Sequence, residues 1–293
     1  MITKFDYLIL EDINIKEYLE YFHLSKSKIY KLFFEKKILV NDLLVKDNYL
    51  LKKNDKLTIL VDEEIDFIPE EGNLEILYED PYYLIINKPR GKIIYDDSKD
   101  KLNSLSNLVA YYYKNKGYHL NIRFCHRLDK DTTGVIVLCK DILCHSYMNY
   151  YISTHDIRRE YHLLVFGKLK NKKGFIDKPL GKDRHNANKM IVTKNGLVAK
   201  TNYEVIKEFD NYSYVRALLE NGRKHQIRVH FASIGNPLLG DSVYGKTNIT
   251  NNLCLHSYSI SFYHPVYQKN IIVKKEEPFE FLNLVRRWYF VKN

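Results

Sequence analysis

The chain has 293 residues, 45% of them hydrophobic, which is enough to form one large folded domain and a smaller one beside it. Its 46 Lys and Arg against 36 Asp and Glu give a formal net charge of +10. That balance favours a polyanionic partner, nucleic acid before an anionic membrane surface. The four Cys form no CxxC pair, and we find neither a secretory signal nor an apolar run long enough to span a membrane. We therefore expect a cytoplasmic protein with reduced thiols and no bound metal.

The N-terminal segment predicts a small α/β module. Ser25 can cap a helix in which Ile29 and Leu32 recur at helical spacing, and two β-like runs follow over 38–41 and 54–61. Lysines crowd the first turns of this helix, where they oppose the helix dipole, so a role other than helix stability is expected for them. We interpret them as contacts to a polyanion. These lysines are Lys26, Lys28 and Lys31.

The order of helix and strands over residues 12–62 resembles the small RNA-binding module named after ribosomal protein S-four. The resemblance implies that this module binds RNA; a solvated basic helix in an ordinary α/β cap remains the alternative. The segment 62–73 contains an acidic run, a Pro and a Gly, and it predicts a linker. We therefore place the domain boundary between residues 1–66 and residues 67–293.

The pattern beyond the linker favours an α+β fold, because its predicted strands do not alternate regularly with helices. A mixed, largely antiparallel sheet is expected. Strands are predicted over 74–78, 83–87, 135–138, 161–166 and 212–219, and helices over 102–112 and 142–152.

Three segments carry candidate chemistry. The first, 125–134, places the carboxylate of Asp129 on a tight loop directly before an apolar run, and such loops on rigid scaffolds commonly hold reactive groups. The second contains Tyr161 within Arg-Arg-Glu-Tyr-His-Leu-Leu-Val. The third, 222–241, contains Arg228 on a short amphipathic helix whose apolar residues are expected to face inward. Those apolar residues are Ile227, Phe231 and Ile234.

In this order the three segments resemble the signature motifs of the RluA family of RNA pseudouridine synthases, and a weaker match falls at Asn87-Lys88-Pro89. The resemblance implies a pseudouridine synthase fold and isomerisation of uridines in structured RNA, either ribosomal RNA of the large subunit or transfer RNA, without a cofactor. It implies that Asp129 is the essential aspartate, that Tyr161 lines the site, and that Arg228 pairs with Asp129.

The resemblance also implies RNA contacts beside the aspartate. Arg127 is the candidate to occupy the stacking space that a flipped base leaves, and His126 and Ile227 complete the predicted RNA-binding set. Asp241, which lies in a Gly-Asp turn, is expected to fix loop geometry.

The reaction itself calls for such groups. The uracil ring leaves the ribose at nitrogen 1 and rejoins it through carbon 5, with no redox change, so one ionised carboxylate at the ring is the main requirement. Burial alone would drive Asp129 toward its neutral form, and a paired arginine reverses that effect. Arginine also offers a planar fork of donors that lysine lacks.

Two alternatives remain open from the sequence. The same scaffold could serve as an RNA-binding factor in ribosome assembly, or it could be a metal-dependent phosphodiesterase. The second alternative would use His126, Asp129, Asp131 and His225 as metal ligands, although their spacing matches no familiar ligand set. In each case we expect a monomer that binds structured RNA and no membrane.

Overall fold

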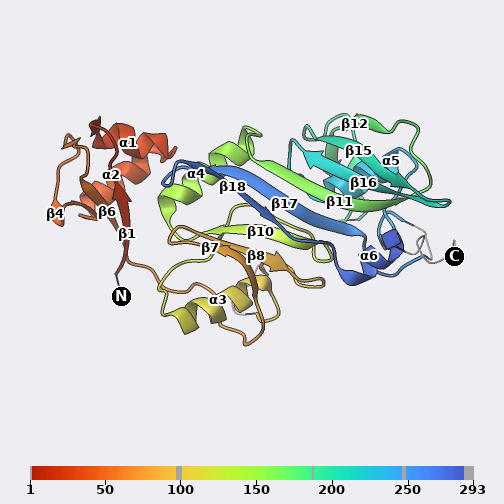
Figure 1. Cartoon of the computed structure of the whole chain (residues 1–293), viewed down its shortest axis with the longest axis horizontal. Coiled ribbons are helices and arrows are strands. Elements are labelled where there is room, and N and C mark those ends of the chain that lie inside the picture. Colours follow the sequence, from red (N-terminus) through yellow and green to blue (C-terminus); the bar gives the residue numbers. More distant parts are fainter. Residues whose placement is uncertain (1, 97–100, 187, 246–248, 287–293) are drawn as a thin grey trace.

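The computed structural model describes residues 2–96, 101–186, 188–245 and 249–286. Its N-terminal part forms a small module at one end of the long axis, and the remainder is built around a long, twisted sheet (Figure 1). No helix in the described ranges is long and apolar enough to cross a membrane.

The N-terminal module combines a small antiparallel sheet with two helices. Its helix α2 begins where the sequence predicts, because Ser25 Oγ accepts a hydrogen bond from Lys28 N at 3.4 Å. The first strand is not predicted from the sequence, because its inward positions are marked only by Phe5 and Tyr7. The sheet order is β1 (Thr3–Leu8), β6 (Lys56–Val61), β3 (Ile38–Val40), β4 (Leu43–Leu44); β2 (Ile13–Asn14) pairs with β5 (Leu50–Leu51), and the helices are α1 (Ile15–Tyr21) and α2 (Lys26–Phe34).

The module packs on the rest of the molecule through a buried aromatic cluster. The Tyr7 hydroxyl donates to Asp141 Oδ1 at 2.6 Å, and this carboxylate also caps the N-terminus of helix α4 (Ile142–Ser153). The Tyr7 ring centroid lies 5.4 Å from that of Tyr82, and Phe22 lies 6.2 Å from Tyr147 of α4. The hydrophobic core is therefore continuous across this junction.

The predicted linker is irregular chain, but it is fastened to the residues that precede strand β9 (Arg123–Phe124). Glu63 Oε2 accepts a hydrogen bond from Asn121 N at 3.0 Å and pairs with Arg123, while Asp66 Oδ1 accepts from Ile122 N at 2.9 Å. The acidic run thus pairs with Arg123 and accepts hydrogen bonds from two part-buried backbone amides, so it does not act as a free joint.

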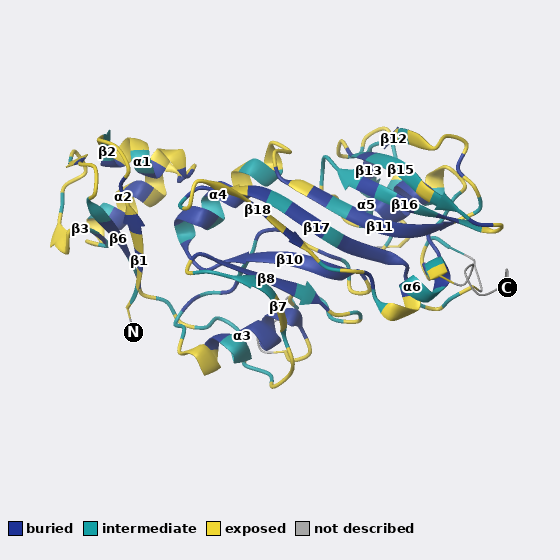
Figure 2. Ribbon diagram, viewed as in Figure 1, coloured by how far each residue is buried: buried dark blue, intermediate teal, exposed yellow. Residues whose placement is uncertain are grey.

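Ten strands of the described chain form the large sheet, and its central strands are buried (Figure 2). Strands β10 and β17 pair in parallel, whereas the other neighbouring strands run antiparallel, which confirms the predicted α+β class with a mixed, largely antiparallel sheet. The order is β12 (Lys173–Asp177), β15 (Lys200–Glu208), β16 (Tyr212–Leu219), β11 (Arg158–Phe166), β17 (Leu255–His264), β10 (Thr133–Cys139), β8 (Tyr83–Lys88), β7 (Glu75–Glu79), with β18 (Lys269–Lys274) beside β17 and β9 beside β10.

The helices and one hairpin complete the fold. Helix α3 begins later than predicted, because Ser104 and Asn107 form a reciprocal capping box that leaves Leu102 outside. Helix α4 and strands β10 and β16 lie where the sequence places them. The remaining elements are α3 (Leu105–Lys116), α5 (Gln226–Ser233), α6 (Phe279–Arg286) and the hairpin of β13 (Leu180–Lys182) with β14 (Met190–Val192).

Gly134 allows β17 to approach β10 closely next to the 125–134 loop, because it has no side chain. Its φ is +107°, a conformation that favours glycine, and a Cβ there would lie 2.2 Å from the carbonyl oxygen of Ser257. The glycine that ends the motif is therefore a condition for the parallel contact that anchors the loop.

Candidate active site

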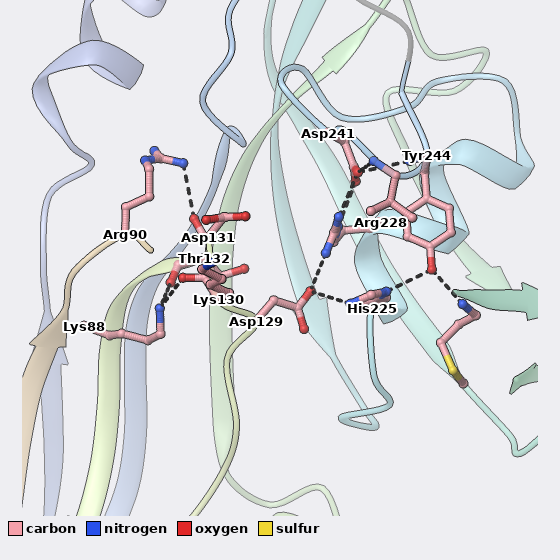
Figure 3. Close-up of polar contacts among 12 residues, drawn as sticks. Lys88, Arg90, Asp129, Lys130, Asp131, Thr132, His225, Arg228, Asp241 and Tyr244 are labelled. Carbon is pink, nitrogen blue, oxygen red and sulfur yellow. Dashed lines mark hydrogen bonds and ion pairs between the residues drawn. The ribbon is translucent and has the colours of Figure 1, made fainter. Parts of the chain in front are cut away.

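Asp129 lies on the loop that enters β10, and Lys88 binds the backbone of this loop through hydrogen bonds (Figure 3). Thr132 N donates to the Asp129 carbonyl oxygen at 3.1 Å and closes the turn. The Lys88 ammonium donates to the carbonyl oxygens of Pro89, Lys130 and Thr132 at 3.0, 2.7 and 2.9 Å. Burial lowers the pKa of Lys88 to about 7. This role of Lys88 is not predicted from the sequence, where the weak Asn-Lys-Pro match is the one signal that points to this residue.

Arg228 is the partner of Asp129, as predicted. Its Nη1 lies 3.1 Å from Asp129 Oδ2. The two-pronged fork, however, points at Asp241 and not at Asp129: Nε and Nη2 donate to the two oxygens of Asp241, each at 2.8 Å. This geometry corrects the expectation that the fork grips Asp129.

Asp241 fixes its own loop as well, because Oδ1 accepts hydrogen bonds from Val243 N and Tyr244 N at 2.9 and 3.1 Å. Its burial would raise the pKa, but the hydrogen bonds from Arg228 lower it. Burial likewise opposes the charge of Arg228, and the contacts with Asp241 raise the Arg228 pKa above its ordinary value. The two groups therefore stay ionised, and Arg228 keeps its charge beside Asp129.

His225 is a second group beside the same carboxylate oxygen. It begins α5 in a left-handed conformation with φ +56°, and its Nε2 lies 3.9 Å from Asp129 Oδ2. The Tyr244 hydroxyl accepts from Met190 N at 2.8 Å and lies 2.9 Å from His225 Nδ1, so its own proton is available for that nitrogen. Burial lowers the pKa of His225, and the neutral ring then presents Nε2–H toward Asp129.

Tyr161 and Ile227 are buried side chains that share a small hollow with Asp129. Tyr161 follows a register shift in β11 at Glu160, and burial raises the pKa of its phenol, which stays protonated at neutral pH. Ile227 and Phe231 face inward as expected, but Ile234 does not: it ends α5 and is 37% exposed.

Arg127 stands at the mouth of the site. Its side chain is exposed, and its guanidinium carbon lies 5.5 Å from the centroid of the Tyr95 ring. The two residues border a cleft of about 510 Å³ that also contains Asp129, His225 and Arg228. Arg127 therefore borders the same cleft as Asp129.

His126 is turned into the protein. Its Nε2 accepts a hydrogen bond from Val137 N at 3.3 Å, and its Nδ1 is buried with no hydrogen-bond partner among the described residues. The ring is not on the open surface of the cleft. The metal-site alternative finds no support in this geometry, since no three His, Cys, Asp or Glu side chains in the described ranges are placed to hold a metal ion.

The predicted lysine contacts lie elsewhere. Lys26, Lys28 and Lys31 are exposed on α2, within the end module, whereas Arg228 lies on α5 toward the opposite end of the molecule (Figure 1). The predicted site residues thus fall into two groups: one around Asp129 and one on α2.

Comparison with known proteins identifies the scaffold. Residues 82–233 match the family model described as RNA pseudouridylate synthase. An uncharacterized RNA pseudouridine synthase of Bacillus subtilis is 37% identical over 270 residues, covering 90% of this chain and 89% of the relative. The ribosomal large subunit pseudouridine synthase D of Buchnera aphidicola is 34% identical over 272 residues, covering 85% of each chain.

Solved structures agree on the fold. The protein described as human RNA pseudouridylate synthase domain containing 4 is 23% identical and superposes with a TM-score of 0.61 over 73% of this chain and 93% of the human one. A second human protein, RNA pseudouridylate synthase domain containing 1, gives a TM-score of 0.60 at the same identity, over 72% of this chain and 87% of its own. The chain belongs to the RluA family of RNA pseudouridine synthases.

Proposed function

We propose that this enzyme isomerises uridines of large-subunit ribosomal RNA to pseudouridine, with Asp129 as the reacting carboxylate. The observation that carries the proposal is the charge arrangement at Asp129, where Arg228, itself fixed by Asp241, holds one carboxylate oxygen at the border of an open cleft. The net charge of +10 and the relatives named for the large ribosomal subunit support RNA of that kind as the substrate.

The target uridine must leave its stack to reach this carboxylate, at a cost of about a few kcal/mol that is lowest in loops and bulges. The hollow beside Asp129 is lined by the apolar side chain of Ile227 and by the phenol ring of Tyr161. Arg127, exposed at the mouth, is placed to fill the space that the base vacates.

The two carboxylate oxygens of Asp129 have different roles. Oδ2 is engaged by Arg228 at 3.1 Å, so Oδ1 is the oxygen that meets the sugar or the uracil ring. The bond from ribose carbon 1′ to nitrogen 1 breaks, the ring rotates, and carbon 1′ joins carbon 5. Carbon 5 then loses a proton and nitrogen 1 gains one. The neutral phenol of Tyr161 is suited to donate a hydrogen bond, not to act as a phenolate base.

The N-terminal module, with residues 1–66 as its bounds, is proposed to bind RNA through the exposed lysines of α2. Beside them lies a groove of about 670 Å³ bordered by Lys26, Lys46 and the exposed rings of Tyr30 and Phe34. Lysines add affinity through RNA phosphates without choosing a sequence, and exposed rings can stack on unpaired bases. A substrate that touches both the module and the Asp129 cleft must extend along the molecule.

The decisive test replaces Asp129 by Asn, which keeps shape and hydrogen bonding but removes the negative charge. We expect folded protein, RNA binding within about twofold of wild type, and no detectable pseudouridine, because the reaction requires the anion. Product is measured by carbodiimide-dependent reverse-transcription stops on large-subunit ribosomal RNA and on transfer RNA, both transcribed in vitro. Substantial isomerisation by Asp129→Asn would refute the assignment, and stops confined to transfer RNA would change the proposed substrate.

A further inference from the structure

Arg159 on β11 is a buried arginine for which the described structure provides no counter-ion. The residue is 4% exposed, no ion pair or hydrogen bond from its side chain is found in the described ranges, and its Nε is buried without an acceptor. Its neighbour Arg158 behaves in the ordinary way: its side chain is 59% exposed and its Nη2 lies 3.5 Å from Glu160. A buried, uncompensated guanidinium is costly to the fold, so its presence calls for a partner of opposite charge.

Arg159 lies next to the active site. It precedes Tyr161 by two residues in β11, and its charge acts on the buried Tyr161 phenol and on His126. A Cβ added to Gly222 would lie 3.0 Å from Arg159 Nη1, so the guanidinium packs directly under the backbone of that loop. Gly222 itself borders the cleft that contains Asp129.

His126 supplies a second buried donor in the same region. Val137 N donates to its Nε2, so the neutral ring carries its proton on Nδ1, and burial together with the nearby Arg159 charge lowers the pKa of His126 to about 3. The ring is therefore neutral at physiological pH, and Nδ1–H is a buried donor with no acceptor among the described residues. Two buried donors in the same region, each unsatisfied among the described residues, indicate an acceptor from outside the protein.

We propose that Arg159 is a phosphate-binding residue of the RNA site, which takes the backbone phosphate of a nucleotide next to the flipped uridine. Phosphate fits better than a base carbonyl, because it brings the negative charge that the buried guanidinium lacks and accepts two parallel hydrogen bonds from it. The proposal rests on the proposed function, since it takes RNA as the substrate. The side chains of Arg127 and of the α2 lysines face solvent, whereas Arg159 lies beneath the Gly222 loop.

The test compares Arg159→Met with the matched variant Arg158→Met. Binding to in vitro transcribed large-subunit ribosomal RNA is measured over a salt series, together with the thermal midpoint with and without inorganic phosphate and the steady-state constants for isomerisation. For Arg159→Met we expect affinity reduced about tenfold and a salt slope shallower by about 1, the loss of one phosphate contact. The thermal midpoint should be unchanged or higher, because an unpaired buried charge is replaced by an apolar chain of similar length.

Phosphate should raise the thermal midpoint of wild type and Arg158→Met more than that of Arg159→Met. Arg158→Met should keep both the wild-type affinity and the wild-type slope. Should Arg159→Met fail to fold, Arg159→Lys replaces it: the charge remains, the fork is lost, and we expect kcat/KM to fall at least fivefold with unchanged stability.

A destabilised Arg159→Met that binds RNA with the wild-type slope would overturn the proposal and make Arg159 a structural residue. Wild-type kcat/KM in Arg159→Lys would overturn it equally. These results leave the proposed function standing, because that function is tested separately by pseudouridine formation in ribosomal RNA with the wild-type enzyme and with Asp129→Asn.

Discussion

At the scale of single residues, Asp129 is held through one of its two oxygens and by groups that are themselves fixed. Arg228 reaches Oδ2 while its fork is clamped by Asp241, and His225 Nε2 lies near the same oxygen. Such a chain of contacts fixes the carboxylate before the substrate arrives, so little reorganisation remains for the reaction itself. The position of the Asp129 carboxylate thus depends on Asp241, a residue that never needs to touch RNA.

Replacement of Arg228 separates the electrostatic from the structural part of this arrangement. Arg228→Lys should lower kcat about a hundredfold or more, because a single ammonium cannot contact both carboxylates in the geometry of the guanidinium. Arg228→Ala should in addition lower the free energy of unfolding by about 3–5 kcal/mol, since it leaves the fully buried Asp241 carboxylate unpaired. Steady-state kinetics and urea unfolding measure the two effects.

The double variant Arg228→Ala with Asp241→Asn is the control. It removes the orphaned charge, so it should recover part of the stability but none of the activity. A double variant as unstable as Arg228→Ala alone would mean that Arg228 matters for packing and not for its pairing with Asp241.

At the scale of elements, helix α2 tests whether the basic surface of the N-terminal module serves RNA. Lys26→Glu with Lys28→Glu and Lys31→Glu reverses exposed charges without opening the core, which Ile29 and Leu32 supply. We expect weaker RNA binding, a shallower salt slope, and kcat close to wild type at saturating RNA, because phosphate contacts add affinity and not chemistry. Filter binding over a salt series together with single-turnover isomerisation measures this.

The matched control reverses three exposed lysines on other elements, Lys4→Glu, Lys53→Glu and Lys274→Glu, and so makes the same change in net charge. If both triple variants lose affinity equally, the effect comes from overall charge and not from α2. Wild-type RNA binding in the α2 variant would mean that the lysines of that helix face solvent and do not contact RNA.

The same module also has a structural task. Tyr7 of β1 is the donor that satisfies the buried Asp141, and the rings of Tyr82 and Tyr147 lie against module residues. Removal of residues 1–66 would expose these rings and leave the Asp141 carboxylate without that donor. Charge reversal on α2 is therefore the cleaner probe of RNA binding, whereas truncation mixes binding with stability.

At the scale of the whole molecule, the segment after β18 crosses back onto the sheet and is fastened there by Glu277. This carboxylate is buried and accepts hydrogen bonds from His162 of β11 and from the Tyr214 hydroxyl of β16. The His162 ring is stacked on Tyr258 of β17, with centroids 3.9 Å apart. The Glu277 carboxylate thereby ties the C-terminal segment directly to two neighbouring strands and, through the His162 ring, to a third.

Glu277 gives the fold a predictable response to acid. Burial would raise its pKa, but the hydrogen bonds from His162 and Tyr214 lower it to about 2, below the ordinary value of 4.5. Because the folded-state pKa is the lower one, its stabilisation is complete above about pH 4.5 and is lost as the pH falls toward 2. Wild type should exceed Glu277→Gln in unfolding free energy by about 3 kcal/mol at pH 7, and the gap should close near pH 2. Urea unfolding at both pH values measures it; a gap of the same size at both would contradict this role.

The sequence by itself determined the fold class, the start of α2 at Ser25, the buried strand β10 and the helix that carries Arg228. It also singled out Asp129 and its partner Arg228, which the structure brings to 3.1 Å. These inferences were possible because caps, hydrophobic periodicity and linear motifs are local: the residues that create each signal lie within a few positions of one another.

Only the tertiary structure decided which groups meet and how far each is buried. It pairs the fork of Arg228 with Asp241, places Lys88 against the Asp129 loop and joins Tyr7 to Asp141. It also buries Arg159 with no counter-ion among the described residues. Most of these contacts or burials depend on segments far apart in the chain, such as residues 7 and 141. The strength of a charge or hydrogen bond is set by its partner and its distance from water, and neither is fixed until those segments have packed together.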